Sequence, residues 1–132
     1  WIAQQKIIAF RKHEVVYDHG RKRRFPIILD RGHRGHVERE AVNAPIQGSV
    51  SDMTFLANLD TLNQLEEEGI RVKPWPHIHD GFLFQIDEDH VDRGVQITME
   101  RMHDVGFKTD VHFATEIKTG TRWGDMKTVY SG

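Results

Sequence analysis

The sequence predicts an α+β fold with an antiparallel sheet, and two patterns indicate it. Apolar residues recur at intervals of three and four in several segments, as they do on one face of an amphipathic helix. Between these segments lie short apolar and β-branched runs, interrupted by the turn-forming triplets Asp18-His19-Gly20 and His79-Asp80-Gly81. The resulting order of helix, hairpin, helix, hairpin, helix and strand is typical of helices packed on an antiparallel sheet.

The first part of the chain is predicted to form a helix and a hairpin. Residues 1–13 are expected to be helical, because one face would carry Ile2, Ala3, Ile7 and Phe10. Residues 15–17 favour a strand, and residues 25–29 its returning partner, with Pro26 marking an irregularity. This arrangement places four basic residues at the hairpin tip, Arg21-Lys22-Arg23-Arg24.

A basic loop over residues 30–36 is predicted to lead into a long helix over about residues 37–68. Pro45 and Gly48 interrupt its pattern, so a kink or a short broken section is expected there. Two strands, over residues 70–78 and 82–86, are then expected on either side of the second turn.

The last part of the chain is predicted to contain a helix over residues 89–104 and a strand over residues 109–118. The helix would present one apolar face made of Val91, Val95, Met99 and Met102. The tail after Gly120 is expected to be irregular, with Trp123 as an anchor.

Composition indicates one globular domain over residues 1–132 and excludes several classes of protein. Hydrophobic residues make up 38% and charged residues 29% of the chain, which argues against disorder. No apolar run approaches the ~20 residues of a membrane span, so no membrane partner is expected. The chain has no cysteine, which excludes disulfides and zinc-thiolate sites and fits an intracellular location.

Charge is distributed unevenly along the chain. The formal net charge is only −2, so overall charge does not indicate nucleic-acid binding. Lys and Arg nevertheless concentrate before residue 40, whereas acids dominate residues 60–92. The N-terminal part of the chain is therefore the part suited to phosphates.

The basic run over residues 21–24 is the first candidate functional feature. A hairpin that carries several cations can follow a phosphate backbone, where each neutralised phosphate releases counterions. A solvated surface turn has the same composition. The run by itself leaves both interpretations open.

The second feature is a polar ridge. Arg39, Asn43 and Gln47 are spaced by four, so a helix would align them where they could reach base edges and sugars in a minor groove. Ordinary helix surfaces carry such residues too. Spacing alone does not decide between a ridge that contacts nucleic acid and an ordinary helix surface.

The third feature is His79-Asp80 at a tight turn between apolar strands. A turn of this kind holds a carboxylate outside the sheet with little conformational freedom, which suits a Mg²⁺ ligand. His77, His79 and Asp80 could instead belong to a His/Asp hydrolase metal site, although one cluster supplies few ligands. An ordinary turn aspartate is the third interpretation.

In this order and at this spacing, the three features resemble the C-terminal palm segment of family A, polymerase I-like DNA polymerases. The most specific run is Asn43-Ala44-Pro45-Ile46-Gln47-Gly48, which follows the basic hairpin and precedes His79-Asp80. Trp1-Ile2 resembles the family's helix after the fingers, and Thr119-Gly120-Thr121-Arg122-Trp123 resembles its closing segment. The resemblance covers essentially the whole chain.

The resemblance implies template-directed DNA synthesis, with primer-template DNA and a deoxynucleoside triphosphate as partners. Arg39, Asn43 and Gln47 would contact the template-primer, and Arg34 its backbone. His79 would lie at the primer terminus, and Asp80 would be a catalytic carboxylate and metal ligand. The implied cofactor is Mg²⁺ in a two-metal site shared with residues outside this chain.

Two departures from the family pattern bear on activity. The family's other metal-binding Asp and its triphosphate-binding fingers residues belong to motifs that precede this segment. The isolated chain is therefore expected to be inactive without the N-terminal remainder of the polymerase. Gly81 also stands where the family usually has Glu. The missing Glu weakens the role of the second carboxylate in this motif, without removing that of Asp80, and suggests a phage-like origin. A different explanation is conformational, because Gly permits a tight turn with positive φ.

Three alternatives to a DNA polymerase remain at this point. A single-subunit RNA polymerase has a similar His-Asp turn followed by a small residue. A non-catalytic DNA-binding remnant of a palm would also explain Gly81. A His/Asp metal hydrolase would require a bound transition metal at His77 and His79.

Overall fold

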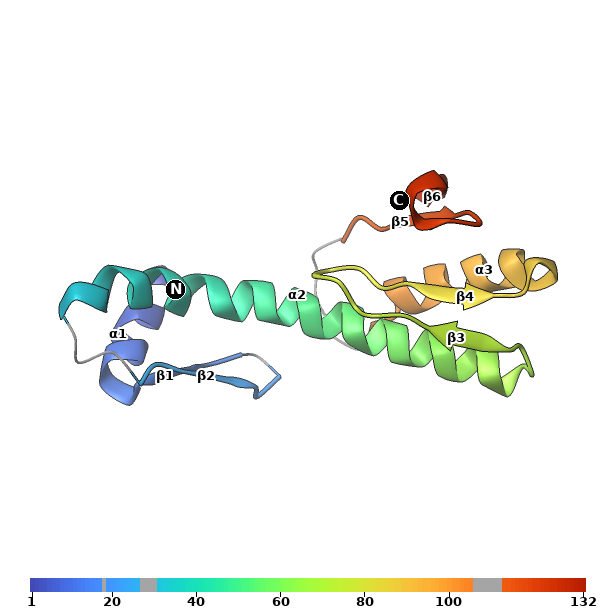
Figure 1. Cartoon of the computed structure of the whole chain (residues 1–132). Coiled ribbons are helices and arrows are strands. Elements are labelled where there is room, and N and C mark those ends of the chain that lie inside the picture. The colour runs from blue at the N-terminus through green and yellow to red at the C-terminus, as the bar shows by residue number, and fades with distance from the viewer. Residues whose placement is uncertain (18, 27–30, 106–112) are drawn as a thin grey trace. The chain divides into compact units, whose positions relative to one another are not determined.

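The computed structural model describes residues 1–17, 19–26, 31–105 and 113–132 (Figure 1). The chain divides into two compact units, Trp1–Asp52 and Met53–Gly132, and the boundary falls within helix α2 (Arg34–Glu67). Helices alternate with antiparallel strand pairs, which confirms the predicted α+β class. Among the described residues the strands form three two-stranded sheets. No helix in these ranges is both long and apolar enough to cross a membrane.

Helix α1 (Ile2–Lys12) opens the first unit. It ends at His13, whose backbone is left-handed (φ 56°) and whose N–H donates to the carbonyl oxygen of Ala9 at 2.9 Å. The predicted apolar face is wrong at Ile2, Ala3 and Ile7, which are exposed, whereas Phe10 does pack against the core. Ala9 is fully buried, whereas Ile2 and Ile7 are 58% and 52% exposed, because the unit's core contacts the helix at Ala9.

The first hairpin pairs β1 (Glu14–Val16) with β2 (Lys22–Arg24), so that Val15 lies opposite Arg23. The chain reverses early, because the Gly20 N–H donates to the Tyr17 carbonyl oxygen at 2.8 Å. Three of the four basic residues therefore form the returning strand itself, and the prediction that all of them lie at the tip is wrong. Of the strand predicted over residues 25–29, residues 27–29 lie outside the described part of the chain.

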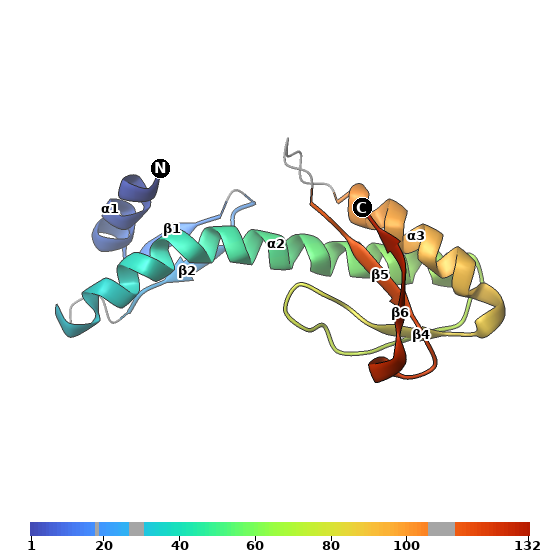
Figure 2. The ribbon, with the colours of Figure 1, turned by 90° about the horizontal axis from the view of Figure 1, so that it is seen from above.

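The core of the first unit lies between this hairpin and α2. Val15, Tyr17 and Phe25 are buried against Val37 and Ala41 of the helix. Both views of the ribbon place β1 and β2 beside the first part of α2 (Figures 1 and 2). The apolar residues of the hairpin thus fix its basic strand next to the helix.

Helix α2 is uninterrupted, so the predicted break at Pro45 and Gly48 is wrong. Proline removes one backbone donor, and the helix continues around it with Pro45 buried. Gly48 has a packing role instead. A Cβ atom at this position would lie 2.2 Å from Cε2 of Tyr17. The absence of a side chain therefore lets the Tyr17 ring lie directly against the helix backbone.

The second unit contains the C-terminal end of α2. Gly69 has a φ of 73°, the Ile70 N–H donates to the Leu65 carbonyl oxygen, and the Gly69 N–H donates to the Glu66 carbonyl oxygen, both at 2.9 Å. These two bonds form a Schellman motif, in which glycine adopts the left-handed conformation at low cost. Leu65 and Ile70 are both buried in the core of this unit.

The second hairpin pairs β3 (Val72–Pro74) with β4 (Phe84–Ile86) and packs against α3 (Val91–His103), which follows a short 3-10 turn (Glu88–His90). Strand and helix approach closely, because a Cβ on Gly94 would lie 3.1 Å from Cδ1 of Ile86. The buried face of α3 therefore differs from the apolar face that was predicted. Its buried residues are Gly94, Ile97 and Thr98, whereas the four predicted apolar positions are only partly buried.

The C-terminal segment contains a third hairpin, which the sequence did not predict. β5 (Glu116–Thr119) pairs with β6 (Lys127–Ser131). The prediction of an irregular tail is therefore wrong beyond Met126, where the chain forms a strand. Trp123 lies in a short 3-10 turn, is 62% exposed and does not act as an anchor. Residues 109–112 of the predicted strand lie outside the described residues.

An ion pair joins the end of α2 to α3 within the second unit. Arg93 Nε donates to Glu68 Oε2 at 2.7 Å, and Arg93 NH2 donates to the other carboxylate oxygen. This hydrogen bonding lowers the pKa of Glu68 to about 2. The neighbouring Arg101 Nε donates to Gln64 Oε1 at 2.8 Å, which adds a second link between the helices.

The Gly48 contact gives the first prediction. Gly48→Ala should lower the free energy of unfolding by about 1–3 kcal/mol, because the Tyr17 ring must move away from the new methyl group. Gly35→Ala is the matched control in the same helix, since its Cβ would meet nothing closer than 3.7 Å. Urea denaturation should show a loss for the first variant only. Equal midpoints for the two variants would contradict the packing argument.

The ion pair gives a pH prediction. Because the folded state lowers the pKa of Glu68, the pair contributes stability above pH 4.5, the carboxyl's ordinary pKa, and loses it as pH falls toward 2. The difference in melting temperature between wild type and Glu68→Gln should therefore shrink over this range. Glu67→Gln removes the same charge next to the pair and serves as control. A similar pH-dependent difference for Glu67→Gln would show that general charge is responsible.

Candidate nucleic-acid interface

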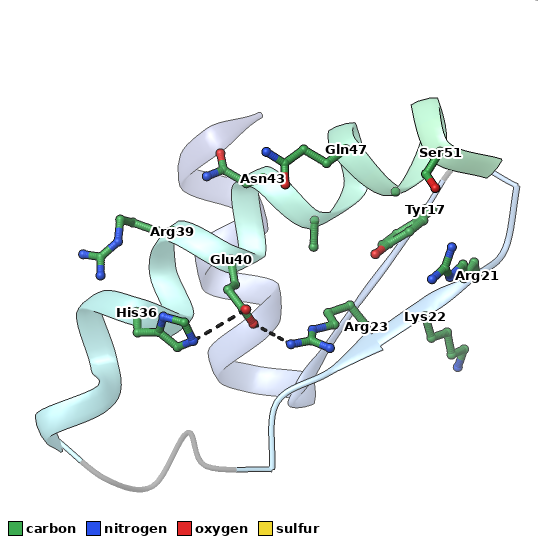
Figure 3. Close-up of a pocket in the computed structure, with 12 residues that line it drawn as sticks. Tyr17, Arg21, Lys22, Arg23, His36, Arg39, Glu40, Asn43, Gln47 and Ser51 are labelled. Atoms are coloured by element: carbon green, nitrogen blue, oxygen red, sulfur yellow. Dashed lines mark hydrogen bonds and ion pairs between the residues drawn. The ribbon is translucent and has the colours of Figure 1, made fainter. Parts of the chain in front are cut away.

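A pocket of about 570 Å³ lies in the first unit, between the β1–β2 hairpin and α2 (Figure 3). The hairpin supplies an aromatic ring and three cations, and the helix supplies polar and small residues. The described lining residues are Tyr17, Arg21, Lys22, Arg23, His36, Arg39, Glu40, Asn43, Ala44, Gln47, Gly48 and Ser51.

The predicted polar ridge forms one part of this lining. Arg39, Asn43 and Gln47 are exposed and follow one another along α2 (Figure 3). Ser51 continues the same four-residue spacing and also lines the pocket. Sequence reasoning missed Ser51, although extending the spacing by one step would have found it.

The hairpin places three of its four basic residues at the pocket, Arg21, Lys22 and Arg23. Two predicted DNA-binding residues are not among the described lining residues. Arg24 projects elsewhere, with 78% of its side chain exposed. Arg34 bonds Glu38 at 3.2 Å through Nε, and its guanidinium lies 5.0 Å from the ring centroid of Phe10.

Acidic partners hold the hairpin cations, and the sequence analysis missed them. Lys22 Nζ donates to Glu14 Oε1 at 2.8 Å, which lowers the pKa of Glu14. Arg23 NH2 donates to Glu40 Oε2 at 2.9 Å, which raises the pKa of Arg23. These pairs orient the cations before any ligand arrives. Glu14 became recognisable as a partner only with the strand pairing, and Glu40 only with the packing of the hairpin on α2.

The hairpin turn is joined to α2 by Asp52. One carboxylate oxygen of Asp52 lies 2.6 Å from Nε2 of His19, and the other accepts a hydrogen bond from Arg21. Arg21 also lies over the ring of Tyr17, 5.5 Å from its centroid. Arg39 differs from these residues, because no acidic side chain within the described ranges pairs with it. Its guanidinium is therefore available to an anion.

The His79-Asp80 turn lies in the second unit. Ile78 and Gly81 exchange two backbone hydrogen bonds, each 2.9 Å long, so that His79 and Asp80 form the tip of the hairpin. Asp80 is exposed. His77 is directed at its own turn, because its Nε2 lies 3.0 Å from the His79 carbonyl oxygen and must donate to it.

The turn's positive φ occurs at His79 (55°), and φ at Gly81 is not positive. The conformational explanation for Gly81 is therefore wrong. A Cβ at Gly81 would meet its nearest atom, the Ile78 carbonyl oxygen, at 3.6 Å, which is ordinary contact. A Cβ atom would therefore fit at this position. The backbone thus gives no physical reason for the absence of a side chain there.

A metal site at Asp80 is incomplete within the described residues. These residues contain no group of three or more His, Asp or Glu side chains placed to hold a metal ion. Asp80 offers one exposed carboxylate, a hard oxygen ligand of the kind that Mg²⁺ accepts. Because Mg²⁺ commonly takes only one or two protein carboxylates, Asp80 fits as a single ligand of a shared site.

The arrangement of helices and hairpins is similar to that of part of a polymerase domain. It matches a solved structure, "POL domain of Pol1 from M. smegmatis complex with DNA primer-template and dNTP", with a TM-score of 0.73 and 28% identity over 83% of this chain and 20% of that one. The chain belongs to DNA polymerase family A, whose family model matches residues 1–125.

Two relatives show how much of a polymerase the chain represents. It is 32% identical over 130 residues to DNA polymerase I B, mitochondrial, of Oryza sativa subsp. japonica, covering 93% of this chain and 12% of the relative. It is 29% identical over 99 residues to DNA polymerase I of Chloroflexus aurantiacus, covering 75% and 10%. The chain therefore spans about a tenth of these relatives.

Proposed function

We propose that the chain supplies the later palm segment of a template-directed DNA polymerase. One observation carries the proposal: in a chain of this family, the polar ridge and the basic hairpin line the same pocket. Primer-template DNA is the ligand that this lining suits, since cations neutralise phosphates while amide and guanidinium groups hydrogen-bond base edges.

The ridge residues have distinct proposed roles. Asn43 and Gln47 present amide groups that both donate and accept hydrogen bonds, so they can contact base edges in the minor groove. Arg39 has no acidic partner within the described ranges and can therefore form a charge-assisted bond with DNA. Arg34 and Arg24, outside the pocket lining, remain proposed backbone contacts only.

The His79-Asp80 turn would serve the chemical step. When bound, Mg²⁺ would stabilise the attacking and leaving oxygens of nucleotidyl transfer. Asp80 would supply a carboxylate ligand to the metal, and its position at a two-residue tip limits how far it can move. His79 would lie at the primer terminus. His77 keeps the turn in shape through its bond to the His79 carbonyl oxygen.

The remaining parts of the proposed enzyme would come from the rest of the polymerase. A second carboxylate and a clamp for the incoming deoxynucleoside triphosphate are needed for two-metal transfer. The 132-residue chain alone should therefore not extend a primer. Tests of activity accordingly use the chain combined with the earlier palm and fingers segments of a relative.

The ridge yields the next prediction. Asn43→Ala and Gln47→Ala should each weaken primer-template use about 5-fold or more, because each removes direct hydrogen bonds worth ~1–3 kcal/mol. Both side chains are exposed, so melting temperatures should change little. Primer-extension rates and thermal melts provide the two measurements. A large loss of thermal stability with normal extension would assign the residue a structural role.

Asp80 and Gly81 yield the last prediction of this section. In the combined polymerase, Asp80→Asn should reduce the extension rate by about 100-fold or more, since the developing phosphoryl charge loses its stabilisation. Gly81→Glu should change the rate only moderately, because a water can complete the coordination of Mg²⁺. Steady-state primer extension at saturating magnesium compares the variants.

Two outcomes of that comparison would be decisive. Near-normal extension by Asp80→Asn would remove the catalytic assignment. A large gain for Gly81→Glu would show that the natural site is impaired and would favour a non-catalytic DNA-binding role for the chain.

A further inference from the structure

One carboxylate lies among the cations of the pocket. Glu40 is the single acid within the described lining residues. One of its oxygens accepts the bond from Arg23 at 2.9 Å, and the other lies 3.5 Å from Nε2 of His36 (Figure 3). The other cations of the lining are Arg21, Lys22 and Arg39.

The shape of the pocket indicates the kind of anion it suits. Its lining extends along α2 from His36 to Ser51, which corresponds to roughly 22 Å of helix. Phosphates of one DNA strand follow one another about every 3.4 Å along the duplex axis. The pocket therefore suits several consecutive nucleotides better than one small anion.

The Arg23–Glu40 pair is well placed for exchange. Half of the Arg23 side chain and 32% of the Glu40 side chain are exposed, so water reaches both partners. Exposed ion pairs contribute little to stability. A phosphate offers the guanidinium the same bidentate oxygen geometry as a carboxylate. A phosphate can thus replace the carboxylate as the partner of Arg23.

We propose that a backbone phosphate of primer-template DNA binds Arg23 by displacing Glu40, so that Glu40 is a built-in competitor of DNA in this pocket. The inference rests on the proposed function, because it assumes that DNA occupies this face of α2. Arg39, which has no acidic partner within the described ranges, makes the first contact. Arg23 then transfers from the carboxylate to the phosphate.

The inference predicts that removing the competitor tightens DNA binding. Glu40→Gln keeps the size of the side chain but loses the charge that holds Arg23. The matched control is Glu67→Gln, on the same helix. It also removes one negative charge, but Glu67 lies in the second unit and is not among the described pocket residues.

Fluorescence anisotropy of a labelled primer-template duplex, at one fixed salt concentration, measures the binding of the 132-residue chain. Kd should fall about two- to five-fold for Glu40→Gln relative to Glu67→Gln, which is the scale of an exposed ion pair. A Kd for Glu40→Gln equal to or above that of the control would overturn the inference.

A double-mutant cycle tests whether Arg23 is the group that changes partners. Glu40→Gln should tighten binding when Arg23 is present and have no effect in an Arg23→Gln background. An undiminished gain without Arg23 would overturn the exchange. A parallel titration uses a deoxynucleoside triphosphate as the probe. A gain for the triphosphate but not for the duplex would also overturn it, since the pocket would then bind free nucleotide.

The same titrations separate failure of this inference from failure of the proposed function. If wild type binds the duplex and Asn43→Ala weakens binding, while Glu40→Gln matches its control, only the competitor is disproved. If wild type does not bind the duplex, or Asn43→Ala leaves Kd unchanged, the DNA-binding role of the ridge fails as well. Thermal melts of each variant confirm that the compared proteins are folded.

Discussion

The contact between Tyr17 and Gly48 sets the geometry of the first unit. A Cβ at Gly48 would lie 2.2 Å from the ring, so only glycine lets the hairpin approach the helix backbone this closely. Tyr17 is buried in the core, and Arg21 lies over its ring. The basic strand next to Tyr17 is consequently held beside the polar ridge of α2. The pocket's position therefore depends on the absence of a side chain at Gly48.

Charge compensation determines how the pocket behaves once it is built. The hairpin cations would repel one another if they were left unpaired, and Glu14, Glu40 and Asp52 offset this repulsion. The pairs are partly exposed, so they orient the cations without strongly stabilising the fold. The same exposure leaves the cations able to accept a different anion. A chain with a formal net charge of only −2 can thus still present a pocket lined by several cations.

The second unit places its carboxylate by a different means. Asp80 lies at a tip where Ile78 and Gly81 exchange backbone bonds, and His77 donates to the carbonyl of the strained His79. The hairpin's body is fixed by the Leu65, Ile70 and Ile97 core and by the close approach of α3 at Gly94. The turn is therefore rigid at its base and exposed at its end. The proposed role of Asp80 as one ligand of a shared metal site rests on this arrangement.

Local sequence determined the helices, the two turns, the four-residue ridge and the family, because each depends on residues close together in the chain. The buried faces of α1 and α3 could not be obtained in this way, since burial depends on which neighbour contacts a helix, as Ala9 and Gly94 show. The packing of the hairpin on α2 decided that Arg23 would face Glu40, 17 residues away. Only tertiary structure gave Gly48 its packing role, because the ring that requires it comes from another element.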